Sequence, residues 1–286
     1  MIGSITVGSI LKDSLKLAWN RKWVILAFLL FSLPVLVAVV MGGAFFLGIF
    51  EPLNLSDAGS AALAVLMGLI FLFLMGAFGM CVYYNFVTAL RGEPRFIPAN
   101  LARKTMRSCL TMFVLAIIAL LVSFAAAIPF GLIFTATLTA TQSLPLIMAG
   151  GILGGIAFGF VVSAIIYRMS IVFPGIAMDE TKTIGGAWDL AKGFTLKMVM
   201  VLFIIEIPSI TMDIIHGYLQ LTYPMNVNIL LGGTIASYIL YTLVGTVNFL
   251  TIVVWYEKLH VRHAERLEAK TELQPESTAD EVADLI

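Results

Sequence analysis

Charged residues are scarce in this chain of 286 residues, because Asp, Glu, Lys and Arg make up only 12% of it. An ordinary soluble domain carries about 25% of these residues. Hydrophobic residues account for 60% of the chain, and the mean hydropathy is +1.01. The formal net charge is zero, so no overall field would attract nucleic acid or an acidic substrate. The composition excludes an ordinary soluble domain and indicates an integral membrane protein.

Residues that carry chemistry are equally few. The only cysteines, Cys81 and Cys109, are expected to be reduced thiols without a disulfide. His260 and His263 are expected to be solvated beyond the last span rather than to bind metal, and His216 is expected at the outer boundary. The sequence contains no zincin pair, nucleophile elbow or Walker loop. We therefore expect no catalytic residue, no metal and no cofactor.

Long apolar runs dominate what is present. A helix needs roughly 20 apolar residues to cross a bilayer, and six runs are long enough: near 23–50, 60–90, 109–140, 145–177, 195–218 and 228–256. The sequence therefore predicts an all-α, polytopic membrane domain over residues 1–263. Residues 264–286 form an acidic tail, expected to continue the last helix briefly and to be disordered after Pro275.

Basic residues are missing from alternate connections between these runs. The loops around 51–60, 141–145 and 216–228 contain no Lys or Arg, and all seventeen basic residues lie in or beside the other connections and the terminal segments. By the positive-inside rule, both termini are expected to be cytoplasmic.

The basic connections also carry amphipathic patterns. Residues 10–19, 99–108 and 184–194 each place apolar residues at helical spacing opposite charged ones, which predicts three interfacial helices on the cytoplasmic side. Gly193 is placed to end the third. The order of amphipathic helix, span and span thus occurs three times, with a period of roughly 80 to 90 residues. A true triplication and a chance similarity of short apolar stretches are equally compatible with this pattern.

Polar residues inside the predicted spans form the candidate intramembrane site. Arg168 and Glu206 would be costly as isolated charges in hydrocarbon. We expect them to face each other inside the bundle, or Glu206 to be kept protonated by its apolar setting. The proposed repeat places Asn85 and Asn248 at the depth of Arg168. An ion pair that fixes helix register is favoured over a substrate or proton site.

Two further features concern position rather than chemistry. Trp19, Trp188 and Lys192 are the expected interfacial anchors, because aromatic rings and lysines settle at the headgroup layer. Gripping of anionic lipid by the lysines around Trp188 is the less favoured interpretation of that helix. Rows of small residues at a spacing of four allow helix backbones to approach closely, and the fourth span is expected at the centre of the bundle because it contains Gly151, Gly155 and Gly159.

The stretch YRMSIVFPGIAMDETKTIGGAWDLAKGF, residues 167–194, resembles a family pattern. It is similar to the membrane domain associated with glycerophosphoryl diester phosphodiesterases and to related multi-span bacterial inner-membrane proteins. The resemblance implies a location in the inner membrane. It also implies a structural signature without a catalytic role, formed by Tyr167, Arg168, Pro174, Ala187, Trp188, Leu190 and Gly193. Such a phosphodiesterase needs a further soluble barrel domain, for which this sequence has neither length nor polarity.

These patterns favour a non-enzymatic membrane module that binds or organises membrane lipid or a protein partner. A carrier or channel for a lipid or small solute is the alternative, because proline-interrupted spans with polar residues often mark transport sites. An intramembrane enzyme is the least favoured class, since few ionisable groups are available. No nucleic-acid partner is expected.

Overall fold

A computed structural model of the chain describes residues 5–27, 30, 57–140, 158–180, 183–223 and 227–273. This part of the chain is helical and contains no strand. Within these residues, five helices are long and apolar enough to cross a membrane: Gly68–Leu90, Leu101–Pro129, Phe158–Met178, Thr195–Gln220 and Leu231–Ala269. The chain is therefore an integral membrane protein. The first predicted span, 23–50, lies mostly outside the described residues.

The first helix, α1 (Val7–Asn20), begins with a capping box in which Thr6 and Ser9 exchange side-chain hydrogen bonds. This arrangement satisfies backbone donors that a helix start leaves unpaired. One face of α1 packs against α9 and α8, and it presents the buried residues Ile10, Ser14 and Leu17. The amphipathic helix predicted at 10–19 is confirmed.

The second connection differs from the prediction. Helix α3 (Asp57–Leu90) is followed by a loop at 91–100 and by α4 (Leu101–Ala140). A separate interfacial helix at 99–108 is wrong, because these residues form the loop end and the first turns of α4. No Pro or Gly interrupts residues 101–128, so the helix continues into the span without a break. Lys104, in the first turn of α4, is only 5% exposed and donates to the Ala177 carbonyl at 2.7 Å. A basic residue expected to face water therefore lies inside the fold.

The helix at 158–170 is interrupted at Ile171 and resumes as α6 (Val172–Met178). Pro174 explains the break, since a proline ring clashes with the carbonyl four residues earlier and removes a backbone donor. Asp179 ends α6 with a φ of 62°, a left-handed conformation that aspartate tolerates better than most residues. The interruption thus falls three residues before Pro174.

The last third of the chain contains α7 (Ile184–Leu190), α8 (Thr195–Thr222) and α9 (Val227–Leu273). Gly193, with a φ of 83°, lies in the turn between α7 and α8, as its predicted role requires. Helix α9 ends at Leu273, beyond the predicted end of the span at 256, which confirms that the first part of the tail continues the last helix. The polar residues there are mostly strong helix formers. Residues 274–286 of the predicted tail lie outside the described residues.

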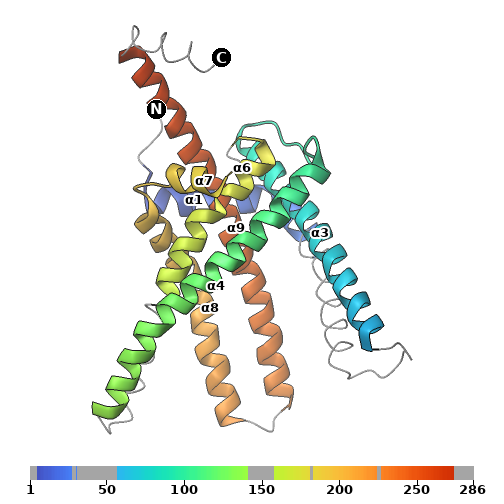
Figure 1. Cartoon of the computed structure of the whole chain (residues 1–286), viewed down its shortest axis with the longest axis vertical. Helices are drawn as coiled ribbons and strands as arrows, with labels where there is room; N and C mark the ends of the chain where they lie inside the picture. The colour runs from blue at the N-terminus through green and yellow to red at the C-terminus, as the bar shows by residue number, and fades with distance from the viewer. Residues whose placement is uncertain are drawn as a thin grey trace.

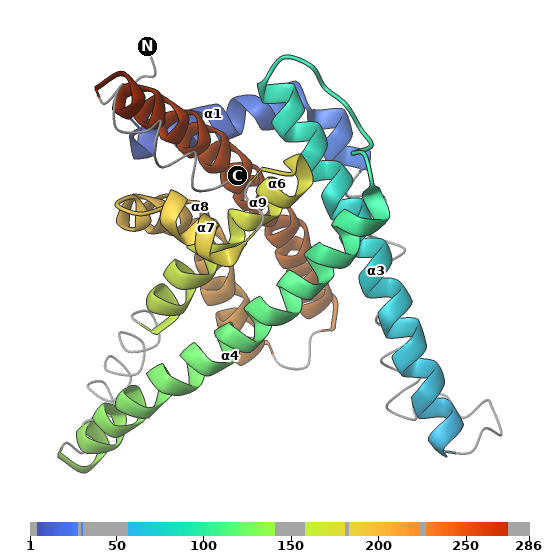
Figure 2. The same cartoon turned by 45° about the horizontal axis from the view of Figure 1, so that its top comes forward.

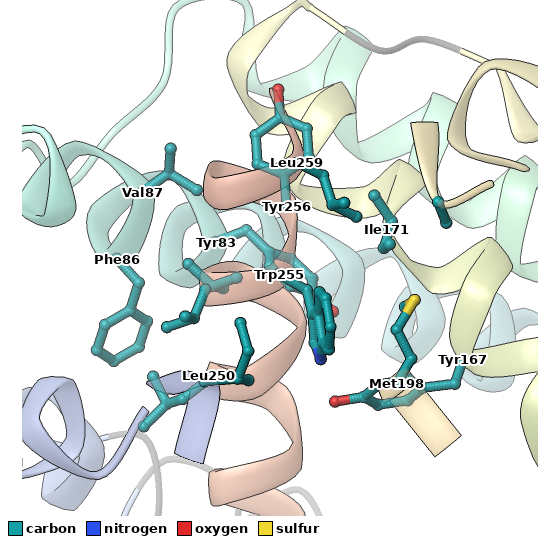
Figure 3. Packing of buried hydrophobic residues seen from close by; sticks show 14 of the residues in the cluster. Tyr83, Phe86, Val87, Tyr167, Ile171, Met198, Leu250, Trp255, Tyr256 and Leu259 are labelled. Atoms are coloured by element: carbon teal, nitrogen blue, oxygen red, sulfur yellow. The ribbon is translucent and has the colours of Figure 1, made fainter. Parts of the chain in front are cut away.

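Most buried side chains gather where α1, α6 and α7 meet the end of α3, the start of α8 and the middle of α9; we call this region the hub (Figures 1 and 2). Figure 3 shows rings and aliphatic side chains from these elements around α9, and the largest fully buried ones are Trp255, Tyr256 and Phe86. Away from the hub, α3 and α4 diverge while α8 and α9 stay together (Figures 1 and 2). Only 6% of the most apolar stretch of α4 is buried.

Close helix packing occurs at a glycine that the sequence patterns did not indicate. A Cβ added to Gly76 in α3 would lie 2.8 Å from the sulfur of Cys109 in α4. Of the predicted packing row, Gly151 and Gly155 lie outside the described residues, and a Cβ at Gly159 would meet nothing within 4 Å. Gly159 therefore does not mediate a close approach to any residue that the structure describes. Both cysteines are free thiols, as predicted.

Candidate functional site

Arg168 lies near the end of the 158–170 helix and is 9% exposed. Its Nε and Nη2 atoms donate to the Trp188 carbonyl at 3.0 and 2.6 Å, and its guanidinium carbon lies 3.7 Å from the centre of the Trp188 ring. The same side chain thus makes hydrogen bonds and a cation–π contact with one residue of α7. Arg168 therefore links α7 to the helix at 158–170.

The end of α7 explains why Arg168 is needed there. The Lys192 amide donates to the Asp189 carbonyl at 3.0 Å, which leaves the Trp188 carbonyl without its usual helical donor. The guanidinium supplies that donor and also places positive charge at a helix C-terminus, where it is favourable. The expected pairing of Arg168 with Glu206 is therefore wrong.

Glu206 instead belongs to a pair of polar contacts that join α8 to α9. The Asn248 amide donates to the Glu206 carboxyl, and the Tyr241 hydroxyl donates to the Asp213 carboxyl. The two contacts are seven residues apart on each helix (213 − 206 and 248 − 241), as an antiparallel helix pair with a heptad spacing requires. These are interhelical hydrogen bonds of the kind that stabilise spans in lipid.

Asn85 serves a different part of the molecule. It is fully buried, and its amide donates to the Arg95 carbonyl at 3.1 Å, while the Arg95 amide donates to the Thr88 hydroxyl at 3.0 Å. Asn85 therefore orders the loop between α3 and α4. The four residues of the predicted polar site lie in three separate contacts, so the structure does not assemble them into one site.

The predicted interfacial anchors differ in how much they are exposed. Trp19 is 73% exposed, with the amine of Lys22 4.8 Å from its ring centre. Trp188 is 36% exposed, because Arg168 covers one side of its ring. Lys192 is exposed. Their location at a headgroup layer stays a prediction, and Trp19 has the more suitable exposure.

Sequence reasoning missed an ionic network on the hub. Arg91, directly after α3, lies 2.7 Å from Glu180 and 2.9 Å from Glu257 of α9. Glu180 also accepts a hydrogen bond from Tyr256 and lies 3.3 Å from Nε2 of His260. Since three elements meet here, the network fixes their relative positions. The sequence did hold a signal for this network, because Glu180 and Glu257 occur beside the basic connections. His260 is not simply solvated as predicted, since it contacts Glu180.

The network changes the proton affinity of its members. Burial favours the neutral form of Glu180, but the hydrogen bonds from Arg91 and Tyr256 and the Arg91 charge outweigh burial, so its pKa lies below the ordinary value. The hydrogen bond to Glu180 is the largest cause that raises the pKa of Arg91. Both groups are therefore charged at neutral pH.

A cleft of about 480 Å³ opens beside this network, between α1, the end of α3 and α9. Its walls combine charged and apolar side chains, namely Asp13, Lys16, Leu17, Asn20, Arg21, Ala89, Leu90, Val254, Glu257 and Lys258. Small-molecule sites typically have volumes of about 300 to 1,000 Å³. The cleft is large enough for a headgroup-sized ligand.

No group of three or more His, Cys, Asp or Glu side chains in the described ranges could hold a metal ion. Comparison of the chain with family models, curated proteins and solved structures gives no match. The resemblance of residues 167–194 to the phosphodiesterase membrane domains therefore stays a prediction.

Proposed function

We propose that this protein is a non-enzymatic membrane module that binds membrane lipid. The observation that carries the proposal is the contrast between the hub and the spans. Buried side chains gather at the hub, whereas α4 exposes large apolar residues over most of its length. Exposed apolar surface of this extent needs a hydrocarbon environment or a partner to cover it. Lipid is the occupant we favour, because these exposed residues belong to helices long enough to span a bilayer.

The position of the charged groups agrees with a lipid-binding role. The Arg91 network and the cleft lie at the hub, and the diverging apolar helices extend from it (Figure 1). A lipid has the same division, with a polar headgroup at one end and acyl chains at the other. The hub would contact headgroups, and the spaces beside α3 and α4 would receive acyl chains.

The proposed topology has six spans, two interfacial helices, α1 and α7, and cytoplasmic termini in an inner membrane. The absence of basic residues from the loops around 51–60, 141–145 and 216–228 supports this orientation. This topology also agrees with the resemblance of residues 167–194 to phosphodiesterase membrane domains. A cysteine introduced at Tyr223, with Cys81 and Cys109 replaced by alanine, should react with an impermeant maleimide from the outer side only. Reaction from the cytoplasmic side alone would reverse the proposed orientation.

A carrier is the second candidate, favoured by the carboxyl groups of Glu206 and Asp213 inside the α8 span. Carboxyl groups inside a span often mark an ion or proton path. Each of these two already has a hydrogen-bond partner on α9, which favours a structural role. The lipid-binding module therefore accounts for more of the structure.

The test is a native mass spectrum of the intact protein after gentle extraction from its membrane. A lipid-binding module should retain at least one phospholipid per chain, and enzymatic removal of that lipid should lower its unfolding temperature. A spectrum with a protein subunit and no lipid would sink the proposal in favour of a protein scaffold. A bound small solute without lipid would favour the carrier.

A further inference from the structure

The acidic side chains that line the cleft between α1, α3 and α9 already have cationic partners. The Asp13 carboxylate lies 2.6 Å from the amine of Lys258, and Glu257 lies 2.9 Å from Arg91. Both acids are therefore engaged in ion pairs at neutral pH. The lining residues include two acidic and three basic side chains, so the formal charge of the cleft lining is positive.

Two cations in the same cleft are not engaged in this way. Lys16 and Arg21 both line it, and no carboxylate among the residues that the structure describes forms an ion pair with either. Asn20, between them in sequence, adds an amide donor to the wall. The cleft thus offers two unpaired positive charges and a neutral donor within one small volume. An anion is the ligand that this combination favours.

The surroundings of these cations indicate where the anion comes from. Leu17, Leu90 and Val254 give the cleft an apolar side. Trp19 and Trp23, on the same chain segment as Arg21, are 73% and 74% exposed. Exposed tryptophans next to apolar spans typically lie at the level of lipid headgroups. The cleft is therefore expected at the depth where a phospholipid presents its phosphate.

We propose that this cleft binds the phosphate of an anionic phospholipid, with Lys16 and Arg21 as its charged ligands and Asn20 as a hydrogen-bond donor. The guanidinium of Arg21 can give two parallel hydrogen bonds to phosphate oxygens, and Lys16 adds a compact charge. The apolar side would contact the glycerol and the first acyl carbons. This assignment rests on the proposed lipid-binding function and adds to it the headgroup class and the binding site.

The experiment uses the full chain in a neutral detergent, titrated with phosphatidylglycerol or phosphatidylcholine and followed by native mass spectrometry. The test variant is Lys16→Ala with Arg21→Ala. The matched control is Lys12→Ala with Lys22→Ala, which removes the same charge from the same segment outside the cleft. Both variants should unfold close to the wild-type temperature, because none of the four residues forms an ion pair within the described residues. The contact of Lys22 with Trp19, which the control removes, lies on an exposed ring.

The wild type should prefer phosphatidylglycerol by roughly tenfold or more, since each basic residue near anionic lipid contributes on the order of 1 kcal/mol. The test variant should lose this preference, and the control should keep it within about twofold. Equal weakening in both variants would mean a general attraction and would overturn the site. Lipid binding without a headgroup preference would contradict this inference and leave the proposed function intact. Absence of any bound lipid would contradict both.

A third arm separates a lipid headgroup from free phosphate. Inorganic phosphate at millimolar concentration should leave the bound phosphatidylglycerol in place, because it lacks contacts to the apolar side of the cleft. Complete displacement by inorganic phosphate, together with phosphate adducts that disappear in the Lys16→Ala and Arg21→Ala variant, would identify a soluble anion as the ligand. That result would overturn the lipid assignment.

Discussion

At the residue scale, Arg168 shows why a charged side chain occurs in an apolar segment. It satisfies a carbonyl that the short helix α7 leaves open and it stacks on the ring of the same residue, Trp188. A lysine has neither the forked donors nor the flat surface for both contacts. The arginine therefore determines where α7 lies against the preceding helix.

Replacing Arg168 by alanine should destabilise the protein by about 1 to 3 kcal/mol, because the Trp188 carbonyl loses its donor. Lysine at this position should give an intermediate loss. Thermal unfolding in detergent measures both variants. Lys192→Ala, an exposed change in the turn after α7, is the control. Equal stability of the Arg168→Ala and Lys192→Ala proteins would contradict the assigned role.

Glu180 should make the stability of the protein depend on pH in the acidic range. Its folded pKa lies below the ordinary value, so the unfolded chain binds the proton more readily. The stabilisation is present at neutral pH and is lost as pH falls from the ordinary glutamate value of about 4.3 through the lower folded value. Unfolding temperatures measured from pH 7 to pH 3 should fall more steeply for the wild type than for Glu180→Gln. Parallel curves would show that Glu180 is not coupled to Arg91.

At the scale of elements, α8 and α9 are held by two interhelical hydrogen bonds in matching register, and α3 approaches α4 at one glycine. The long apolar runs predicted the class of these helices, because such runs have few alternatives, and they predicted the bounds of α3 and α8 to within a few residues. It could not predict the partners of Glu206 or Gly76. Those depend on the rotation of each helix about its axis, which contacts with neighbouring helices determine.

The Glu206 contact predicts a specific energetic coupling. In a double-mutant cycle with Glu206→Ala and Asn248→Ala, the interaction energy should be about 0.5 to 1 kcal/mol, the size measured for hydrogen bonds between spans. Glu206→Ala combined with Arg168→Ala should give effects that add. Unfolding in mixed detergent provides the energies. A larger coupling to Arg168 than to Asn248 would restore the original ion-pair prediction.

The α3–α4 contact predicts opposite effects of two similar changes. Gly76→Ala should cost about 1 to 3 kcal/mol, because the new methyl group overlaps the sulfur of Cys109. Gly79→Ala, on the same helix, should be neutral or stabilising, since its Cβ would meet nothing within 4 Å. Thermal unfolding compares them, and Cys109→Ala should relieve the Gly76→Ala defect. Two equally mild glycine variants would argue against a close approach at Gly76.

At the scale of the whole molecule, the sequence predicted a membrane protein correctly and did not predict the hub. Hydropathy reports only where a chain prefers hydrocarbon, so it located the spans and was silent about how they diverge. Hydropathy also gave no sign that Lys104 is buried, because its partner, the Ala177 carbonyl, lies 73 residues away in sequence. The Arg91 network was missed for the same reason, since it joins three distant segments.

Site-specific photocrosslinking from α4 tests most directly whether lipid covers the exposed spans. A photoreactive amino acid would replace, one at a time, Leu110, Phe113, Leu120 and Phe124, all more than 60% exposed. In native membranes each position should crosslink to phospholipid, and Leu115, which is buried, should crosslink within the chain. Mass spectrometry identifies the products. Crosslinks from the exposed positions to another protein, with no lipid adduct, would contradict the account.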